Sequence, residues 1–401
     1  MDKNLLDKIN AAIDKALEDF QSNPDIIFEN ELERLKYKYG EPKELKNWKK
    51  KQKCIVDGCD KKSIEKSHTI QKSGSIKELA ESDHILTPNF NIETGEMEMQ
   101  SVGVKIASTF PGYCIEHESL FSEFENEKDY KTGEHMGLQL YRTVCREIVI
   151  NEYQKKSLED IQKRYIAFRD KMMFDAFILN LDEEILNTPN LELKDFKLKS
   201  KDGRLRLVEN QIKSIDRNLK EFLYPYRDAI LNDLKKKKFQ KIAYTAITFN
   251  QQIPVALAGK GNFYYKKNIN IIMNILPRSD NTYIFFSTLK KHTEALKIYM
   301  RRFENPLLMM NAIESCMIHG SDHWFIKPSV WNRIDTEFQQ EILNSIFDDK
   351  YDIADKFEMT IFNDLKQAYF DLAENEIILP DDVADLIKVE KEKLTFKKNC
   401  P

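Results

Sequence analysis

The chain has 401 residues, of which 32% are charged and 41% hydrophobic, and it contains 24 Phe and 16 Tyr. This length, roughly two to three ordinary domains, excludes a single small module, and the apolar content excludes a disordered chain. The net charge of −4 neither indicates nor excludes a nucleic-acid partner, because the local distribution of charge decides such contacts.

The sequence shows no sign of membrane insertion or secretion. No stretch approaches the roughly 18 uninterrupted apolar residues of a membrane span, and the first ten residues resemble an amphipathic helix rather than a signal peptide. We therefore expect a cytoplasmic protein with no membrane partner. Six cysteines are too few for a disulfide scaffold of this size, so in a reducing compartment the close pair Cys54 and Cys59 favours metal binding.

The first two predicted regions differ in composition. Residues 1–42 have apolar residues at helical spacing, interrupted at Asn23-Pro24, and are interpreted as an N-terminal helical arm. Residues 43–133 are turn-rich and form a predicted small metal-binding module. Between Lys43 and Lys66 there are nine Lys against four acidic residues, which is either a solvated surface or a strip that contacts phosphates. The candidate phosphate contacts are Lys49, Lys50, Lys51 and Lys53.

The remaining chain divides into a helical region and a mixed domain. Residues 134–242 are helical in pattern throughout and predict two or three long antiparallel helices. Residues 243–401 predict a C-terminal α+β domain. Its β-branched and aromatic runs between 243 and 289 indicate a small antiparallel sheet of four strands, with turns at 259–262 and 278–281. Helices are expected near 292–304, 305–318, 336–348 and 355–375, so the predicted fold class is α+β and mainly helical.

Two pairs of potential metal ligands carry the most specific signal. Cys54 and Cys59 are separated by four residues, and Cys114 and His117 by two. Two such pairs can supply the four ligands of a tetrahedral zinc site. Asp57-Gly58 provides a tight turn just before the second cysteine, and apolar residues after His117 indicate that the second pair lies where a helix begins.

One histidine remains if these four residues bind zinc. His68 lies between the two pairs, and a neutral imidazole near a metal-organised site is suited to act as a general base. Two alternatives stay open: His68 is a hydrogen-bonded structural residue, or it is itself a zinc ligand in place of His117.

The elements follow one another in the order of a first Cys pair, a His on an extended segment, and a second ligand pair where a helix begins. Over about 75 residues this order resembles the treble-clef finger of HNH-type nucleases. The resemblance implies a structural zinc ion held by Cys54, Cys59, Cys114 and His117, with His68 as the base. It also implies that Asn89 or Asn91 orients that base and that Glu118 approaches a catalytic Mg or Mn ion. The family usually has a metal ligand before the central His, where this chain has Ser67.

These observations favour an HNH-like metal-dependent endonuclease, or a nuclease-derived binder of DNA or RNA, with bacterial defence proteins as an analogy in architecture. The alternative is a non-enzymatic zinc-finger protein whose C-terminal domain binds another protein. Other motifs are interpreted as structural. Met309, Ile313 and Met317 indicate a buried helical face, Trp324 and Trp331 an aromatic packing patch, and Gly259-Lys260-Gly261 a hairpin turn.

Overall fold

The computed structural model describes residues 7, 8, 11, 12, 15, 52–91, 94, 96–127, 129–179, 203–346, 350–355, 357, 361–376 and 385–392. The expected N-terminal arm at 1–42 therefore lies outside the described residues, apart from five of them. The chain forms two compact units. The first comprises Met1–Trp48, Ile92–Gly95 and Ile150–Glu221, and the second Lys49–Asn91, Glu96–Val149 and Phe222–Pro401.

The described part of the first unit is built mainly from two helices, the later part of α7 (Gly133–Leu179) and α9 (Gly203–Asn218). They are antiparallel, because Lys155 Nζ lies 2.6 Å from Asp216 Oδ1 and Asn218 Nδ2 donates to Asn151 Oδ1 at 3.0 Å. These contacts confirm the antiparallel helices predicted for this part of the chain. No described helix is both long enough and apolar enough to span a lipid bilayer.

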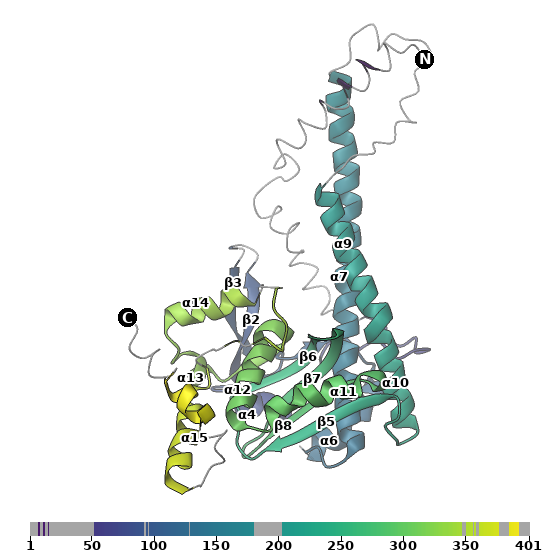
Figure 1. Ribbon diagram of the computed structural model, residues 1–401. Helices are drawn as coiled ribbons and strands as arrows, with labels where there is room; N and C mark the ends of the chain where they lie inside the picture. The colour runs from purple at the N-terminus through teal and green to yellow at the C-terminus, as the bar shows by residue number, and fades with distance from the viewer. Residues whose placement is uncertain are drawn as a thin grey trace. The chain divides into compact units, whose positions relative to one another are not determined.

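The second unit contains a seven-stranded antiparallel sheet (Figure 1). The strand order is β3-β2-β9-β6-β7-β8-β5. The strands are β2 (His84–Asn91), β3 (Glu96–Gly103), β5 (Ile242–Phe249), β6 (Val255–Tyr265), β7 (Lys267–Pro277), β8 (Thr282–Leu289) and β9 (Trp324–Ile326).

The four strands predicted between 243 and 289 are confirmed as β5 to β8, but one predicted turn is wrong. Gly259-Lys260-Gly261 lies inside β6, where these residues pair with Ile271–Met273 of β7. The reversal occurs instead at Lys266, which has a φ of 59°. Gly259 is required for packing rather than for turning, since a Cβ atom there would lie 2.1 Å from Ser321 Oγ.

The sheet is larger than the predicted one because strands from an earlier part of the chain join it. In β2, Leu86 pairs with Ile326 of β9, and Thr87 Oγ1 donates to the Trp324 carbonyl at 2.8 Å. The expected module at 43–133 and the expected domain at 243–401 therefore share one sheet. Their separation failed as a prediction because a half-buried strand does not show in its own sequence which strand it will pair with.

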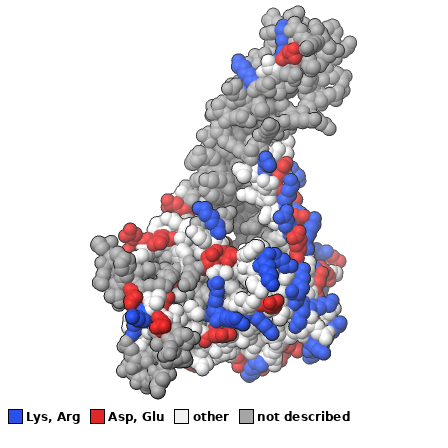
Figure 2. Space-filling view, viewed as in Figure 1, with Lys and Arg blue, Asp and Glu red and all other residues white. Residues whose placement is uncertain are grey.

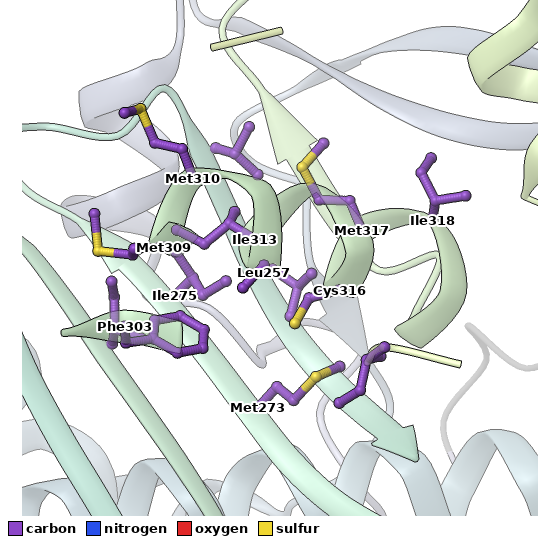
Figure 3. Close-up of a cluster of buried hydrophobic side chains, with 14 of the residues drawn as sticks. Leu257, Met273, Ile275, Phe303, Met309, Met310, Ile313, Cys316, Met317 and Ile318 are labelled. Carbon is purple, nitrogen blue, oxygen red and sulfur yellow. The ribbon is translucent and has the colours of Figure 1, made fainter. Parts of the chain in front are cut away.

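One face of the sheet is covered by α11 (Thr293–Met300) and α12 (Pro306–Ser315), followed by the turn of helix Cys316–Gly320. Figure 3 shows Met309, Ile313 and Met317 among Leu257 and Ile275 of the sheet, and all five side chains are buried. The predicted helical face is thus confirmed as core. Trp324 and Trp331 also pack together, with ring centroids 6.4 Å apart.

The first part of α7 lies on the other face of β7. The side chain of Asn274 accepts hydrogen bonds from Gln139 Nε2 at 3.0 Å and Thr143 Oγ1 at 2.8 Å, and all three residues are buried. Adjacent strand residues point to opposite faces, so Asn274 meets α7 while Met273 and Ile275 enter the core under α12. The remaining longer helices are α10 (Tyr224–Lys235), α14 (Thr336–Ser345) and α15 (Asn363–Glu376).

Candidate metal centre

The first ligand pair lies on a tight loop closed by backbone hydrogen bonds. Lys53 and Lys62 form an antiparallel bridge, and the Cys54 N–H donates to the Lys61 carbonyl at 2.9 Å. The Cys59 N–H donates to the Val56 carbonyl at 3.0 Å across the turn that contains Gly58. Gly58 has a φ of 79°, a left-handed conformation that glycine adopts without steric cost, as the Asp57-Gly58 turn signal predicted.

The second pair lies where a two-stranded antiparallel sheet passes into a helix. β1 (Ser67–His68) pairs with β4 (Thr109–Phe110), and α5 (Ile115–Glu118) begins directly after Cys114. The Glu118 N–H donates to the Cys114 carbonyl at 2.8 Å, which closes the first turn. The predicted position of Cys114 and His117 at a helix start is therefore confirmed.

The two pairs meet in the folded chain. The metal-ligating atoms of Cys54, Cys59, Cys114 and His117 all lie within 4.8 Å of one another. Cys59 Sγ is 3.9 Å from Cys114 Sγ, and His117 Nδ1 is 3.4 Å from Cys54 Sγ and 3.3 Å from Cys114 Sγ. Zn–S bonds of about 2.3 Å and Zn–N bonds of about 2.1 Å in a tetrahedron place ligand atoms roughly 3.5–3.8 Å apart. The four residues are therefore close enough to bind one metal ion.

The two buried thiols of the cluster have different electrostatic surroundings. Burial raises the pKa of the Cys54 thiol. Burial also opposes ionisation of Cys114, but the His117 backbone N–H, followed by the other two cysteines, outweighs it and lowers the pKa of this thiol. The Cys114 N–H in turn donates to Cys54 Sγ at 3.3 Å. Metals bind thiolates, so backbone donors directed at the sulfur atoms favour the form that coordinates.

His68 is on β1 and is not a member of the four-residue cluster. The structure thus favours His117 over His68 as the fourth ligand. His68 Nδ1 lies 3.0 Å from the Ala107 carbonyl oxygen, to which it donates, so Nε2 is the proton-accepting nitrogen of the ring. Burial, together with Arg142 and nearby lysines, lowers the pKa of His68 from 6.5 to about 4, which keeps the ring neutral at pH 7.

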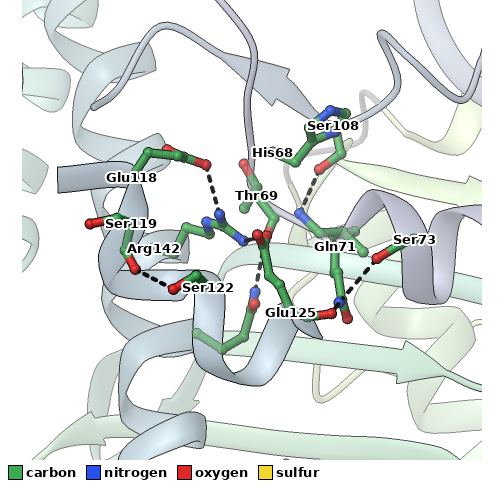
Figure 4. A network of polar contacts seen from close by, with 12 residues as sticks. His68, Thr69, Gln71, Ser73, Ser108, Glu118, Ser119, Ser122, Glu125 and Arg142 are labelled. Atoms are coloured by element: carbon green, nitrogen blue, oxygen red, sulfur yellow. Dashed lines mark hydrogen bonds and ion pairs between the residues drawn. The ribbon is translucent and has the colours of Figure 1, made fainter. Parts of the chain in front are cut away.

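Glu118 is held in a buried ion pair, as Figure 4 shows. Arg142 Nη2 lies 2.8 Å from Glu118 Oε1, and Arg142 Nη1 lies 2.7 Å from Glu125 Oε1. The guanidinium also stacks over the ring of Phe121, 4.1 Å from its centroid. Burial raises the pKa of Glu118, against the opposing effect of Arg142. The carboxylate proposed for a second metal ion is therefore already paired with a fixed cation.

Arg142 is the important residue whose role the sequence left open. It is buried on α7 between Tyr141 and Thr143, and its charge ties the helices after Cys114 to the long helix. A signal was present, because Arg142 follows Leu140 and Tyr141 and precedes Val144 and Cys145. A cation in such a buried stripe needs a carboxylate partner, but the sequence does not show which of the neighbouring acids supplies it.

The remaining predicted site residues lie elsewhere. Asn89 is in β2 of the seven-stranded sheet, opposite Glu98, whereas His68 is in the two-stranded sheet. Asn91 ends the same strand and donates to Glu98 Oε2 at 3.1 Å. Lys53 forms an exposed ion pair of 2.7 Å with Asp60. Lys49, Lys50 and Lys51 lie outside the described residues.

The fold and the site together define a mixed α/β protein with an antiparallel sheet and a Cys3His cluster able to bind a metal ion. Comparison of the chain with known protein families, curated proteins and solved structures gives no match. Its function must therefore be argued from the site itself.

Proposed function

We propose that Cys54, Cys59, Cys114 and His117 hold one structural zinc ion. Three thiolates and one imidazole are a ligand set typical of closed, tetrahedral zinc sites. The spacings between the ligand atoms support such a site, and the two cysteine-bearing turns are joined by the Ile55 N–H, which donates to the Gly112 carbonyl at 2.9 Å.

We further propose that this segment is a treble-clef-like finger. The loop with Cys54 and Cys59, the hairpin of β1 and β4, and the helix that begins after Cys114 follow one another in the order of that motif. The finger departs from a compact one in its hairpin, because residues 69–108 between the two strands include β2 and β3 of the large sheet.

We propose that the protein is an HNH-like metal-dependent endonuclease, or a nucleic-acid binder derived from one. The observation that carries this proposal is His68, a neutral imidazole on the finger hairpin whose Nδ1 is fixed by the Ala107 carbonyl. Its Nε2 would take a proton from water, whose oxygen attacks the phosphorus while the bond to the leaving oxygen breaks. A Mg or Mn ion would neutralise the negative charge that develops on the phosphate. Glu118 could bind such an ion only in competition with its ion pair to Arg142.

Plasmid nicking and metal analysis test this proposal together. We expect one zinc per chain and Mg- or Mn-dependent nicking in the wild-type protein. His68→Ala should abolish nicking but keep the zinc, Cys114→Ser should lose the zinc, and His84→Ala, which changes an exposed histidine, should alter neither. A wild-type protein that cleaves neither DNA nor RNA, or a fully active His68→Ala variant, would refute the nuclease.

One observation favours a second candidate, a non-enzymatic finger that binds another protein. Glu118 is neutralised by Arg142, and Ile115 and Leu120 beside the cluster expose 76% and 49% of their surface. Exposed apolar residues are a feature of protein interfaces. If this candidate is correct, Ile115→Asp and Leu120→Asp will abolish capture of a specific protein partner with the zinc content unchanged, and no nuclease activity will be detected.

A further inference from the structure

A strongly basic surface lies at one end of the large sheet, outside the finger. Figure 2 shows Lys and Arg side chains gathered over the region of α11 and the adjoining strand ends. Residues 290–302 contain five cations against one acidic residue, Glu294. The exposed cations that we call the basic surface are Lys266, Lys267, Lys290, Lys291, Lys297 and Arg301.

The topology of the sheet brings these residues together. Lys266 and Lys267 form the tip of the hairpin between β6 and β7, and Lys290 and Lys291 follow the end of β8. The hydroxyl of Thr288 at the end of β8 donates to the Asn270 carbonyl near the start of β7, so the two chain segments end side by side.

A second contact joins the hairpin tip to the helix. Tyr265 at the end of β6 donates from its hydroxyl to Glu294 Oε1 of α11 at 3.3 Å. Burial lowers the pKa of His292, and the charges of Lys267 on the hairpin and of Lys291 add to this effect. The basic surface is therefore continuous across three elements rather than a run of neighbours in sequence.

The charge of this surface is not balanced within the described residues. None of the six cations lies within ion-pair distance of a carboxylate among the residues with described side chains. Two acids lie nearby: Glu294 accepts from the Tyr265 hydroxyl, and Asp352 accepts from the Tyr264 backbone N–H at 2.7 Å. Their two negative charges are fewer than the six positive charges of the basic surface. Like charges on one surface repel one another, and an anionic partner would relieve the repulsion.

One aromatic residue narrows the choice of partner. Tyr264, next to the hairpin tip, exposes 71% of its surface, and an exposed ring beside cations is suited to stack on a base. A membrane partner would require a wider apolar face, but the only large apolar residue exposed on the described α11 is Ile298, at 39%. The surface thus fits a nucleic acid better than a lipid headgroup layer.

We propose that the basic surface binds the phosphate backbone of a nucleic acid and forms a second contact region in addition to the finger. The inference rests on the proposed function for the nature of the partner. It does not require the finger to be catalytic.

Neutralising part of the surface tests the proposal in the full-length protein. The test variant is Lys266→Gln, Lys267→Gln and Lys291→Gln combined. The control variant is Lys156→Gln, Lys163→Gln and Lys213→Gln, which removes the same charge from exposed positions of α7 and α9. Binding to labelled duplex DNA and to single-stranded RNA is measured by fluorescence anisotropy between about 50 and 200 mM salt.

The test variant should bind about tenfold more weakly and lose about three units of salt slope, while the control stays within about twofold of wild type. Equal losses in both variants, no loss in the test variant, or wild-type binding to anionic phosphatidylserine vesicles but to neither nucleic acid would overturn the proposal. The His68→Ala variant separates the two proposals, because it should lose cleavage and keep full binding. Binding without any cleavage by the wild-type protein would support this inference and refute the nuclease.

Discussion

At the scale of single residues, the Cys3His cluster was predictable and the environment of His68 was not. Two pairs of Cys and His residues, each with short spacing, predict a shared metal ion, because few other structural roles require this pattern. The pKa of His68, in contrast, depends on burial and on Arg142, which belongs to a helix more than 60 residues further along the chain. Nothing in the residues next to His68 shows that helix.

His68 should make stability depend on pH. The unfolded chain takes up a proton on this ring near pH 6.5, whereas the folded chain does so only at about pH 4. The unfolded state therefore binds more protons between these values, so the free energy of unfolding falls as pH drops through this window and is unaffected above it. Between about pH 7 and pH 4, we expect wild type to lose about 2–3 kcal/mol more than His68→Gln, as measured by urea unfolding.

His84→Gln is the matched control for this measurement, because His84 is exposed on β2. It should keep the pH slope of the wild-type protein. Identical slopes in wild type and His68→Gln would show that the ring is solvated in the folded state.

At the scale of secondary structure, strongly patterned elements were predicted well and close approaches between elements were not. The β-branched and aromatic runs of residues 243–289 and the Met309–Met317 spacing each reflect the burial of a single element, which its own sequence shows. Glycine is common in turns, so the Gly259-Lys260-Gly261 motif by itself predicts a turn. A glycine is needed at position 259 because the side chain of Ser321 lies against it. Ser321 is some 60 residues away in sequence, so local composition cannot show this contact.

Gly259→Ala tests this explanation. The added methyl group would lie 2.1 Å from Ser321 Oγ and 2.6 Å from its Cβ, so the segment before β9 must shift. We expect the free energy of unfolding to fall by about 1–3 kcal/mol, as found for overpacked interiors.

Gly103→Ala is the control at the end of β3, where the nearest atom to an added Cβ would be 3.9 Å away. It should change stability by no more than about 0.5 kcal/mol. Guanidinium denaturation of both variants provides the comparison, and equal effects would contradict a packing role for Gly259.

At the scale of the whole molecule, the domain boundaries were the least predictable feature. A sheet that takes strands from 84–103 and from 242–326 cannot be divided by cutting the sequence between them. Pairing between distant strands is decided by the folded sheet, and single-sequence patterns carry no information about it.

A fragment of residues 243–401 should therefore not fold alone. It lacks β2 and β3, which would leave β9 without its outer neighbour, and it lacks α7, which would leave the buried amide of Asn274 without Gln139 and Thr143. We expect no cooperative thermal transition by circular dichroism, and recovery of one when residues 1–242 are supplied as a separate chain. A sharp transition in the isolated fragment would show that its sheet is self-sufficient.

The long separation between Thr87 and Trp324, 237 residues, has a consequence during synthesis. The four residues of the Cys3His cluster are all made by residue 117, so this cluster can assemble early, while one side of β2 has no neighbour until β9 emerges. An open strand edge is a template for pairing with other chains. For most of its translation, the nascent chain therefore has to avoid pairing of this β2 edge with strands of other chains.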